Sequence, residues 1–210
     1  MKKRTLTTTA LLSLLIGITA WAFYPADTAP VEELELGSQA PMTETEVKDV
    51  SGEMLTLAGV AQENGLLVIF SCNTCPWVEA WEDRYNPIAN LAAEKGIGMI
   101  ALNPNTTYRD RGDGFKDMKQ RAQEMNYQFP YALDESNRLA DAFGASKTPH
   151  VFLFNSDLEL VYKGAIDDNA KSAEEVSRHY LRDAINELAA GEEISTRSSQ
   201  SLGCSIKRAR

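Results

Sequence analysis

The sequence is poor in the residues that build metal centres and disulfide frameworks. It has three cysteines and two histidines among 210 residues. An odd number of cysteines cannot all pair within one chain, so at least one thiol is free or pairs with another molecule. One C-x-x-C supplies only half of a tetrahedral zinc site, and Cys204, His150 and His179 are the remaining soft ligands. Covalent haem attachment is excluded, because Pro76 stands where a histidine is needed.

Positive charge is scarce as well. Lysine and arginine number 21 against 30 aspartate and glutamate residues, which gives a formal net charge of −9. Dense basic blocks are confined to residues 2–4 and 207–210. A surface that binds nucleic acid must be basic, so nucleic acid is excluded as a partner.

Long apolar runs are also missing, and the first 22 residues have the layout of a secretory signal. A basic start precedes an apolar run at 10–20, which is too short to span a bilayer comfortably, and Ala20-Trp21-Ala22 is a small-x-small cleavage site. We expect a periplasmic or secreted protein, held at a membrane only if this segment stays uncleaved. Cleavage changes the net charge from −9 to −12, and export places the cysteines where disulfides persist.

The remaining chain divides into a leader, a folded domain and a tail. Residues 23–40, rich in proline and acidic residues, predict a flexible, solvated leader, and 191–210 predict a polar tail. Within 41–190, hydrophobic periodicity predicts strands that alternate with helices. The expected strands are a hairpin at 45–57, buried strands at 66–71 and 97–102, a short strand at 129–133 and a second hairpin of 151–155 with 158–163. The expected helices are 75–95, 115–126, 136–143 and 172–190, the last begun by a capping box of Ser172 and Glu175.

Cys72 and Cys75 stand where the first buried strand meets a helix. A helix N-terminus stabilises a thiolate, which is the nucleophile in disulfide exchange. The disulfide between them would close too small a loop to add much stability, so a structural role is disfavoured. Together with this pair, Pro149 at the start of a predicted strand favours a cis Thr148-Pro149 bond, which would present the Thr148 backbone to an incoming chain.

These segments resemble a known family. The order of elements and "LADAFGASKTPHVFLF" resemble the thioredoxin fold. The segments "SCNTCPWV", "FPYALDESNRLADAFGASKTPHVFLF" and the terminal "GCSIK" resemble the peroxiredoxin-like redoxins of the alkyl hydroperoxide reductase/thiol-specific antioxidant superfamily, over residues 36–207. The resemblance implies an α/β, thioredoxin-like three-layer fold at 41–190, with a central mixed sheet, an N-terminal β-hairpin and a helical insertion. It implies Cys72 and Cys75 as the redox centre, beside a cis Pro149.

The departures from these families bear on the activity. Thioredoxins carry a tryptophan and a buried acid where this chain has Ser71 and Leu66. The proline and threonine that precede the reactive cysteine of peroxidases are absent, whichever cysteine is counted from. We therefore expect an exported thiol-disulfide oxidoreductase without metal or cofactor, in which Cys72 attacks and Cys75 resolves. Its partners would be thiol or disulfide protein substrates and an electron-donor protein. The alternative is an antioxidant thiol peroxidase with a sulfenic acid intermediate.

Two further hypotheses concern groups around the pair. A copper carrier would bind its metal through Cys72, Cys75 and His150, since thiolates and imidazole suit copper. In the stripe of Trp77, Trp81 and Tyr85, we expect mostly core packing, with Trp77 available to a docking partner. The acidic residues that interleave with this stripe are expected to form a solvated face: Glu79, Glu82 and Asp83.

The third cysteine, Cys204, has two interpretations. In one, Leu202 and Ile206 dock the tail on the domain, and Cys204 is simply a small packed residue. In the other, docking brings Cys204 near the redox pair, where it accepts the disulfide from Cys72 and passes it onward. The family's terminal "GCSIK" favours docking and leaves the chemistry open.

Overall fold

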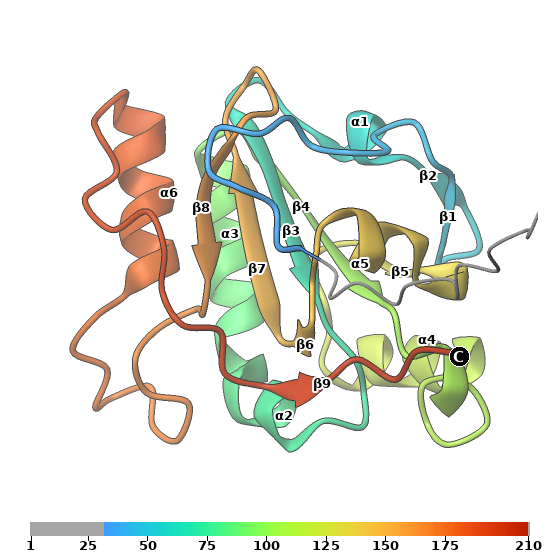
Figure 1. Ribbon diagram of the computed structural model, residues 1–210. Coiled ribbons are helices and arrows are strands. Elements are labelled where there is room, and N and C mark those ends of the chain that lie inside the picture. Colours follow the sequence, from blue (N-terminus) through green and yellow to red (C-terminus); the bar gives the residue numbers. More distant parts are fainter. Residues whose placement is uncertain (1–31, 210) are drawn as a thin grey trace, which may run out of the picture.

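The computed structural model describes residues 32–209, so the expected signal segment and the first part of the leader lie outside it. Among the described residues, every helix is too short or too polar to cross a membrane. The chain forms one seven-stranded mixed sheet with strand order β2-β1-β5-β4-β3-β7-β8 (Figure 1). A separate two-stranded ribbon pairs β6 with β9 near the carboxyl end of the chain.

The elements follow in a β/α order. The strands are β1 (Val47–Asp49), β2 (Met54–Leu55), β3 (Gly65–Phe70), β4 (Ile97–Asn103), β5 (Tyr131–Leu133), β6 (Lys147–Thr148), β7 (His150–Phe154), β8 (Leu160–Gly164) and β9 (Cys204–Ser205). The helices are α1 (Leu57–Val60), α2 (Pro76–Trp81), α3 (Tyr85–Glu94), α4 (Phe115–Glu124), α5 (Arg138–Ala142) and α6 (Tyr180–Ala190). Single 3₁₀ turns are η1 (Glu82–Arg84), η2 (Thr106–Tyr108) and η3 (Glu135–Asn137).

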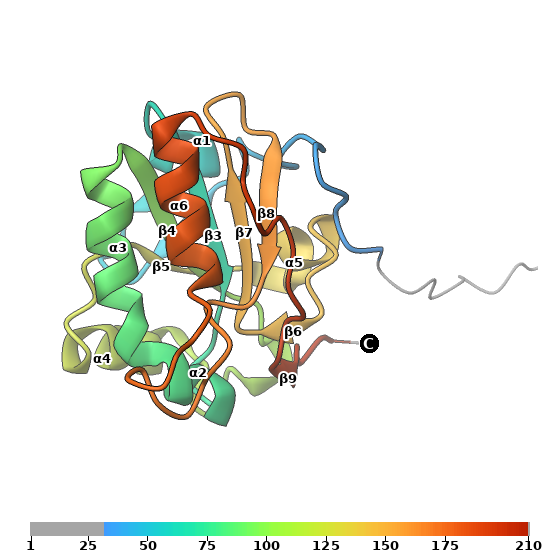
Figure 2. The same cartoon turned by 90° about the vertical axis from the view of Figure 1, so that its left-hand side faces the viewer.

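The sheet is built around β3, which is buried along its whole length. It runs parallel to β4 and antiparallel to β7. A continuous apolar run is typical of a strand covered on both faces, and two apolar clusters cover it here. One includes residues of α2, α3, α4 and α6, and the other includes residues of α1 and α5; Figure 2 shows α3 and α6 side by side on one face. The implied three-layer fold with its N-terminal hairpin is confirmed.

Two predicted helices differ from the observed ones. The helix expected at 172–190 begins only at Tyr180. The side chains of Asp168 and Asn169 accept hydrogen bonds from backbone amides at 171–172 and 177–178, which holds this segment as a loop. The helix expected at 75–95 is divided into α2, η1 and α3. Pro87 explains the division, because proline has no amide hydrogen to bond the preceding turn.

The leader is more ordered than predicted. It was expected to be solvated to residue 40, but Gly37 and Ala40 donate backbone hydrogen bonds to Leu160 and Leu158, each at 2.8 Å. The polar tail was expected to dock on the domain, and it runs along β8 and then pairs with β6 (Figure 2). Of the two predicted anchors, Ile206 is buried at 6% exposure, whereas Leu202 is 40% exposed.

His150 on β7 faces away from the cysteines. Side chains alternate along a strand, and the His150 ring packs 4.5 Å from the ring of Phe152, in the apolar cluster that contains no cysteine. The residue is fully buried, and both ring nitrogens lack a hydrogen-bond partner among the described residues. Burial lowers the pKa of His150 from its ordinary value of 6.5 to about 4, and Lys163 and Lys147 add to this while Glu33 opposes it.

This burial predicts a specific loss of stability in acid. Between its unfolded and folded pKa, His150 binds a proton only in the unfolded chain, so the free energy of unfolding falls as the pH drops from 6.5 to about 4. The expected loss is roughly 3 kcal/mol. Urea unfolding of wild type and His150→Leu at pH 7 and pH 4 measures it, because carboxylate effects are common to both. An equal acid-induced loss in the two proteins would contradict the assignment.

Candidate redox site

Cys72 and Cys75 lie on the turn between β3 and α2. Pro76 takes the first helical position, where its missing N–H costs nothing. Cys75 is therefore the N-cap, and its carbonyl accepts hydrogen bonds from the amides of Val78 and Glu79. Both cysteines are free thiols and almost fully buried, at 2% and 3% exposure. The predicted strand-to-helix position is confirmed, with Cys75 rather than Cys72 at the helix terminus.

Thr148 contacts both sulfur atoms. The Thr148-Pro149 peptide bond is cis, as predicted. The Thr148 hydroxyl oxygen lies 3.1 Å from Cys72 Sγ, and the Cys75 thiol donates to the Thr148 carbonyl at 3.1 Å. The sequence therefore predicts correctly that this loop, some 75 residues away along the chain, lies against the C-x-x-C pair.

Asp113 anchors the turn that carries the cysteines, and the sequence did not single it out. Its fully buried carboxylate accepts hydrogen bonds from the Asn73 amide at 2.7 Å and the Thr74 hydroxyl at 2.7 Å. Asn103 at the end of β4 and Asn105 just beyond it also donate to the carboxylate, at 3.1 and 2.9 Å. Both residues between the cysteines are thus held by one charge. The available signal was an aspartate between two glycines, close behind a buried strand that ends in asparagine.

Hydrogen bonds favour Cys75 as the thiolate. The Cys72 thiol donates to Cys75 and, with weaker donors at Cys204 and Val78, lowers the pKa of Cys75 to about 5 against the effect of burial. The Thr148 carbonyl opposes this, since it favours a protonated Cys75. The same bond to Cys75 raises the pKa of Cys72, and burial and the charge of Asp113 add to it. This direction differs from the sequence expectation that Cys72 is the attacking thiolate, and the Thr148 hydroxyl, which lowers the pKa of Cys72, favours the expected order.

The aromatic stripe behind the pair is only partly core. Trp81 and Tyr85 are buried, and the Tyr85 hydroxyl lies 3.0 Å from the Ser71 hydroxyl oxygen. Trp77 is 39% exposed, and its role as a docking surface stays a prediction. The expected solvated acidic face is wrong for Glu82, which is 4% exposed. Its carboxylate accepts hydrogen bonds from Arg121 on α4 and from the Tyr127 hydroxyl.

The copper hypothesis does not fit the site. His150 points to the opposite face of the sheet from Cys72 and Cys75. Within residues 32–209, no group of three or more His, Cys, Asp or Glu side chains is placed to hold a metal ion.

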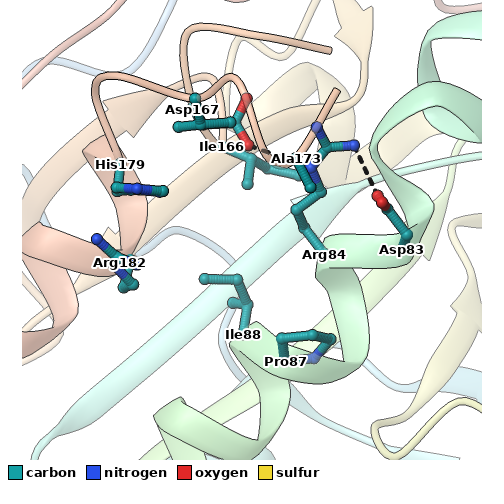
Figure 3. Close-up of a pocket in the computed structure, with 10 residues that line it drawn as sticks. Asp83, Arg84, Pro87, Ile88, Ile166, Asp167, Ala173, His179 and Arg182 are labelled. Carbon is teal, nitrogen blue, oxygen red and sulfur yellow. Dashed lines mark hydrogen bonds and ion pairs between the residues drawn. The ribbon is translucent and has the colours of Figure 1, made fainter. Parts of the chain in front are cut away.

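A cavity of about 220 Å³ lies between α3 and the loop that precedes α6 (Figure 3). Its lining includes Asp83, Arg84, Asp167 and His179 but no cysteine. Arg84 pairs with both carboxylates, at 2.7 Å for Asp83 and 3.4 Å for Asp167. Trp81 also donates to Asp167 at 2.6 Å. The residues that line the cavity thus connect the end of α2 and the turn after it to the loop that precedes α6.

Known proteins are similar to this chain in sequence and fold. Residues 36–163 match the AhpC/TSA family. Thiol-disulfide oxidoreductase ResA of Bacillus anthracis is 25% identical over 160 residues, which cover 76% of this chain and 87% of that protein. The crystal structure of an uncharacterized conserved protein from Geobacillus kaustophilus is 32% identical, with a TM-score of 0.77 and coverage of 83% and 93%. A hypothetical protein from Sinorhizobium meliloti 1021 is 30% identical, with a TM-score of 0.77 and coverage of 85% and 97%.

Fold, site and relatives agree on the class, which is that of the thioredoxin-fold redoxins. Solved peroxiredoxins at 12% and 13% identity share the fold. The match to residues 36–163 spans more than half of the chain, and the protein belongs to the AhpC/TSA family.

The Asp113 anchor predicts two coupled effects of Asp113→Asn. Asparagine has one acceptor oxygen where aspartate has two, and its NH₂ group would face the groups that now donate to the carboxylate. The free energy of unfolding should therefore fall by roughly 3 kcal/mol. The pKa of Cys72 should also fall, because the Asp113 charge raises it. Urea unfolding and the pH dependence of thiol alkylation measure the two effects. Asp110→Asn, at an exposed position of the same loop, is the matched control, and equal behaviour of the two variants would refute the anchor.

Proposed function

We propose that the protein is a thiol-disulfide oxidoreductase that acts outside the cytoplasm through the Cys72–Cys75 pair. The observation that carries the proposal is the contact of one residue, Thr148, with both sulfurs at 3.1 Å beside a cis proline. The name of the ResA relatives supports it. Export is supported by the basic and apolar layout of the first 22 residues.

The proposal gives each group a role in the exchange. The Cys75 thiolate attacks one sulfur of a substrate disulfide, forming a mixed disulfide while the substrate's other sulfur leaves as a thiolate and takes a proton. Cys72 then attacks Cys75, releases the second substrate thiol and closes the Cys72–Cys75 disulfide. The Thr148 hydroxyl stabilises Cys72 while it carries charge, since hydrogen bonding to a thiolate lowers its pKa. A donor dithiol protein reopens the pair by the same steps in reverse.

Cysteine variants test these roles. Cys75→Ser should abolish turnover of a disulfide-bonded peptide with a dithiol. Cys72→Ser, with Cys204 also changed to serine so that no second thiol can resolve the intermediate, should accumulate mixed disulfides on Cys75. Alkylation of reduced Cys75 should stay fast at neutral pH and slow only below its pKa of about 5. Mass spectrometry identifies the mixed disulfides, and alkylation quenched at a series of times measures the rate at each pH. Trapping on Cys72 instead would restore the order expected from the sequence, and full activity of both variants would sink the proposal.

Peroxide reduction is the second candidate, because solved peroxiredoxins share the fold. One equivalent of hydrogen peroxide separates the two activities. The proposal predicts that the reduced protein reacts no faster than an ordinary thiolate of the same pKa. Rapid formation of a sulfenic acid at Cys72 or Cys75 would instead establish a peroxidase.

A further inference from the structure

We propose that Cys204 is a third redox thiol, which forms a disulfide with Cys75 and carries oxidising equivalents between the buried pair and external thiols. The proposal rests on the proposed function and adds a residue and a route to it. It keeps the predicted docking of the tail and changes the expected acceptor contact from Cys72 to Cys75.

Strand pairing places Cys204 on the face that carries the redox pair. In the antiparallel ribbon of β6 and β9, Cys204 lies directly opposite Thr148. Opposed residues of antiparallel strands point their side chains to the same face, with Cβ atoms about 5 Å apart. The Thr148 side chain on that face contacts Cys72, and Cys204 packs against the apolar cluster that contains Cys72 and Cys75. The neighbouring Cys204 side chain is also among the groups that lower the pKa of Cys75.

The tail is held on both sides of Cys204. Gly203 passes so close to the loop that an added Cβ would lie 2.3 Å from the Thr148 carbonyl oxygen, so only glycine fits there. Upstream, Lys147 donates to the Ser201 carbonyl at 2.9 Å. Downstream, the Lys207 amide donates to Asn105 at 2.9 Å. Asn105 also donates to Asp113, so one residue connects the docked tail with the anchor of the cysteine turn.

Docking of the tail also determines which of the three sulfur atoms an incoming protein reaches first. Cys72 and Cys75 are almost fully buried, whereas Cys204 is half-buried. The tail strand occupies the edge of Thr148, which is where an incoming chain was expected to pair. A protein dithiol or disulfide that approaches the docked state therefore reaches Cys204 before it reaches the pair.

The proposed step is an internal disulfide exchange. The Cys204 thiolate attacks Cys75 Sγ of the Cys72–Cys75 disulfide; the Cys75–Cys204 bond forms, the Cys72–Cys75 bond breaks, and Cys72 leaves as a thiolate that takes up the proton lost by Cys204. The pKa of Cys204 is raised to about 11 by burial first and then by its contact with a charged Cys75. The second cause is absent when Cys75 is in a disulfide, so oxidation of the pair lowers the pKa of Cys204 toward its ordinary value, while burial still raises it.

Cysteine variants of the full chain test the step. Reduced Cys72→Ser is mixed with excess oxidised glutathione, quenched with N-ethylmaleimide and mapped by mass spectrometry. We expect an internal Cys75–Cys204 disulfide, formed at least ten times faster than Cys72–Cys204 forms in Cys75→Ser. The double variant Cys72→Ser/Cys204→Ser should keep glutathione on Cys75. If Cys204 in Cys72→Ser stays a thiol or keeps a glutathione adduct, the relay is overturned.

A second pair of variants tests the docking. In the Cys72→Ser background, Gly203→Ala should slow formation of the Cys75–Cys204 disulfide at least tenfold, because the added methyl displaces the strand from Thr148. Leu202→Ala, at the neighbouring exposed position, should change it less than twofold. Equal rates of disulfide formation in the two variants would refute the placement of Cys204 by docking.

Wild-type protein treated with oxidised glutathione in the same way separates the two proposals. If wild type forms no Cys72–Cys75 disulfide, the proposed function is wrong. If wild type forms it but Cys72→Ser forms no Cys75–Cys204 disulfide, only the relay is wrong.

Discussion

Thr148 contacts each of the three cysteines through a different group. Its hydroxyl lies against Cys72, its carbonyl accepts from Cys75, and its backbone pairs with Cys204. Strand pairing and a glycine in the tail hold Thr148 in these three contacts. The β3–β7 pairing brings the cis-proline loop beside the end of β3, since Phe70 lies opposite His150, and Gly203 allows the tail to approach the Thr148 carbonyl. A shift of this loop would therefore change the surroundings of all three sulfurs at once.

The second constraint is the buried charge of Asp113. A buried carboxylate is tolerated only when its oxygens are fully hydrogen-bonded, and the donors here come from the cysteine turn and from the segment after β4. Through Asn105 the same network reaches Lys207 in the tail. Order in the turn and order in the tail are thus linked by hydrogen bonds. The charge also disfavours a thiolate at Cys72, which helps to place the negative charge on Cys75.

The features that local sequence pattern encodes could be predicted. The apolar run of β3, the C-x-x-C at its end and the proline just before β7 were enough to predict the sheet centre and the cis-proline contact. Groups whose state depends on a distant partner could not be predicted: Glu82 is buried because Arg121 and Tyr127 meet its carboxylate, and Asp113 sits in a loop that composition alone marks as polar. The start of α6 was misplaced because the side chains of Asp168 and Asn169 compete for amides that a helix would use.

Function through this site requires that Cys72 and Cys75 form a reversible internal disulfide in contact with Thr148. Equilibration of the protein with glutathione buffers over a range of potentials, with free thiols counted after quenching, is the direct test. We expect one two-electron transition that removes two of the three thiols, without dimer formation, at a midpoint that Thr148→Val shifts because Cys72 loses its hydroxyl partner. Three thiols at every potential, or oxidation only to disulfide-linked dimers, would contradict it.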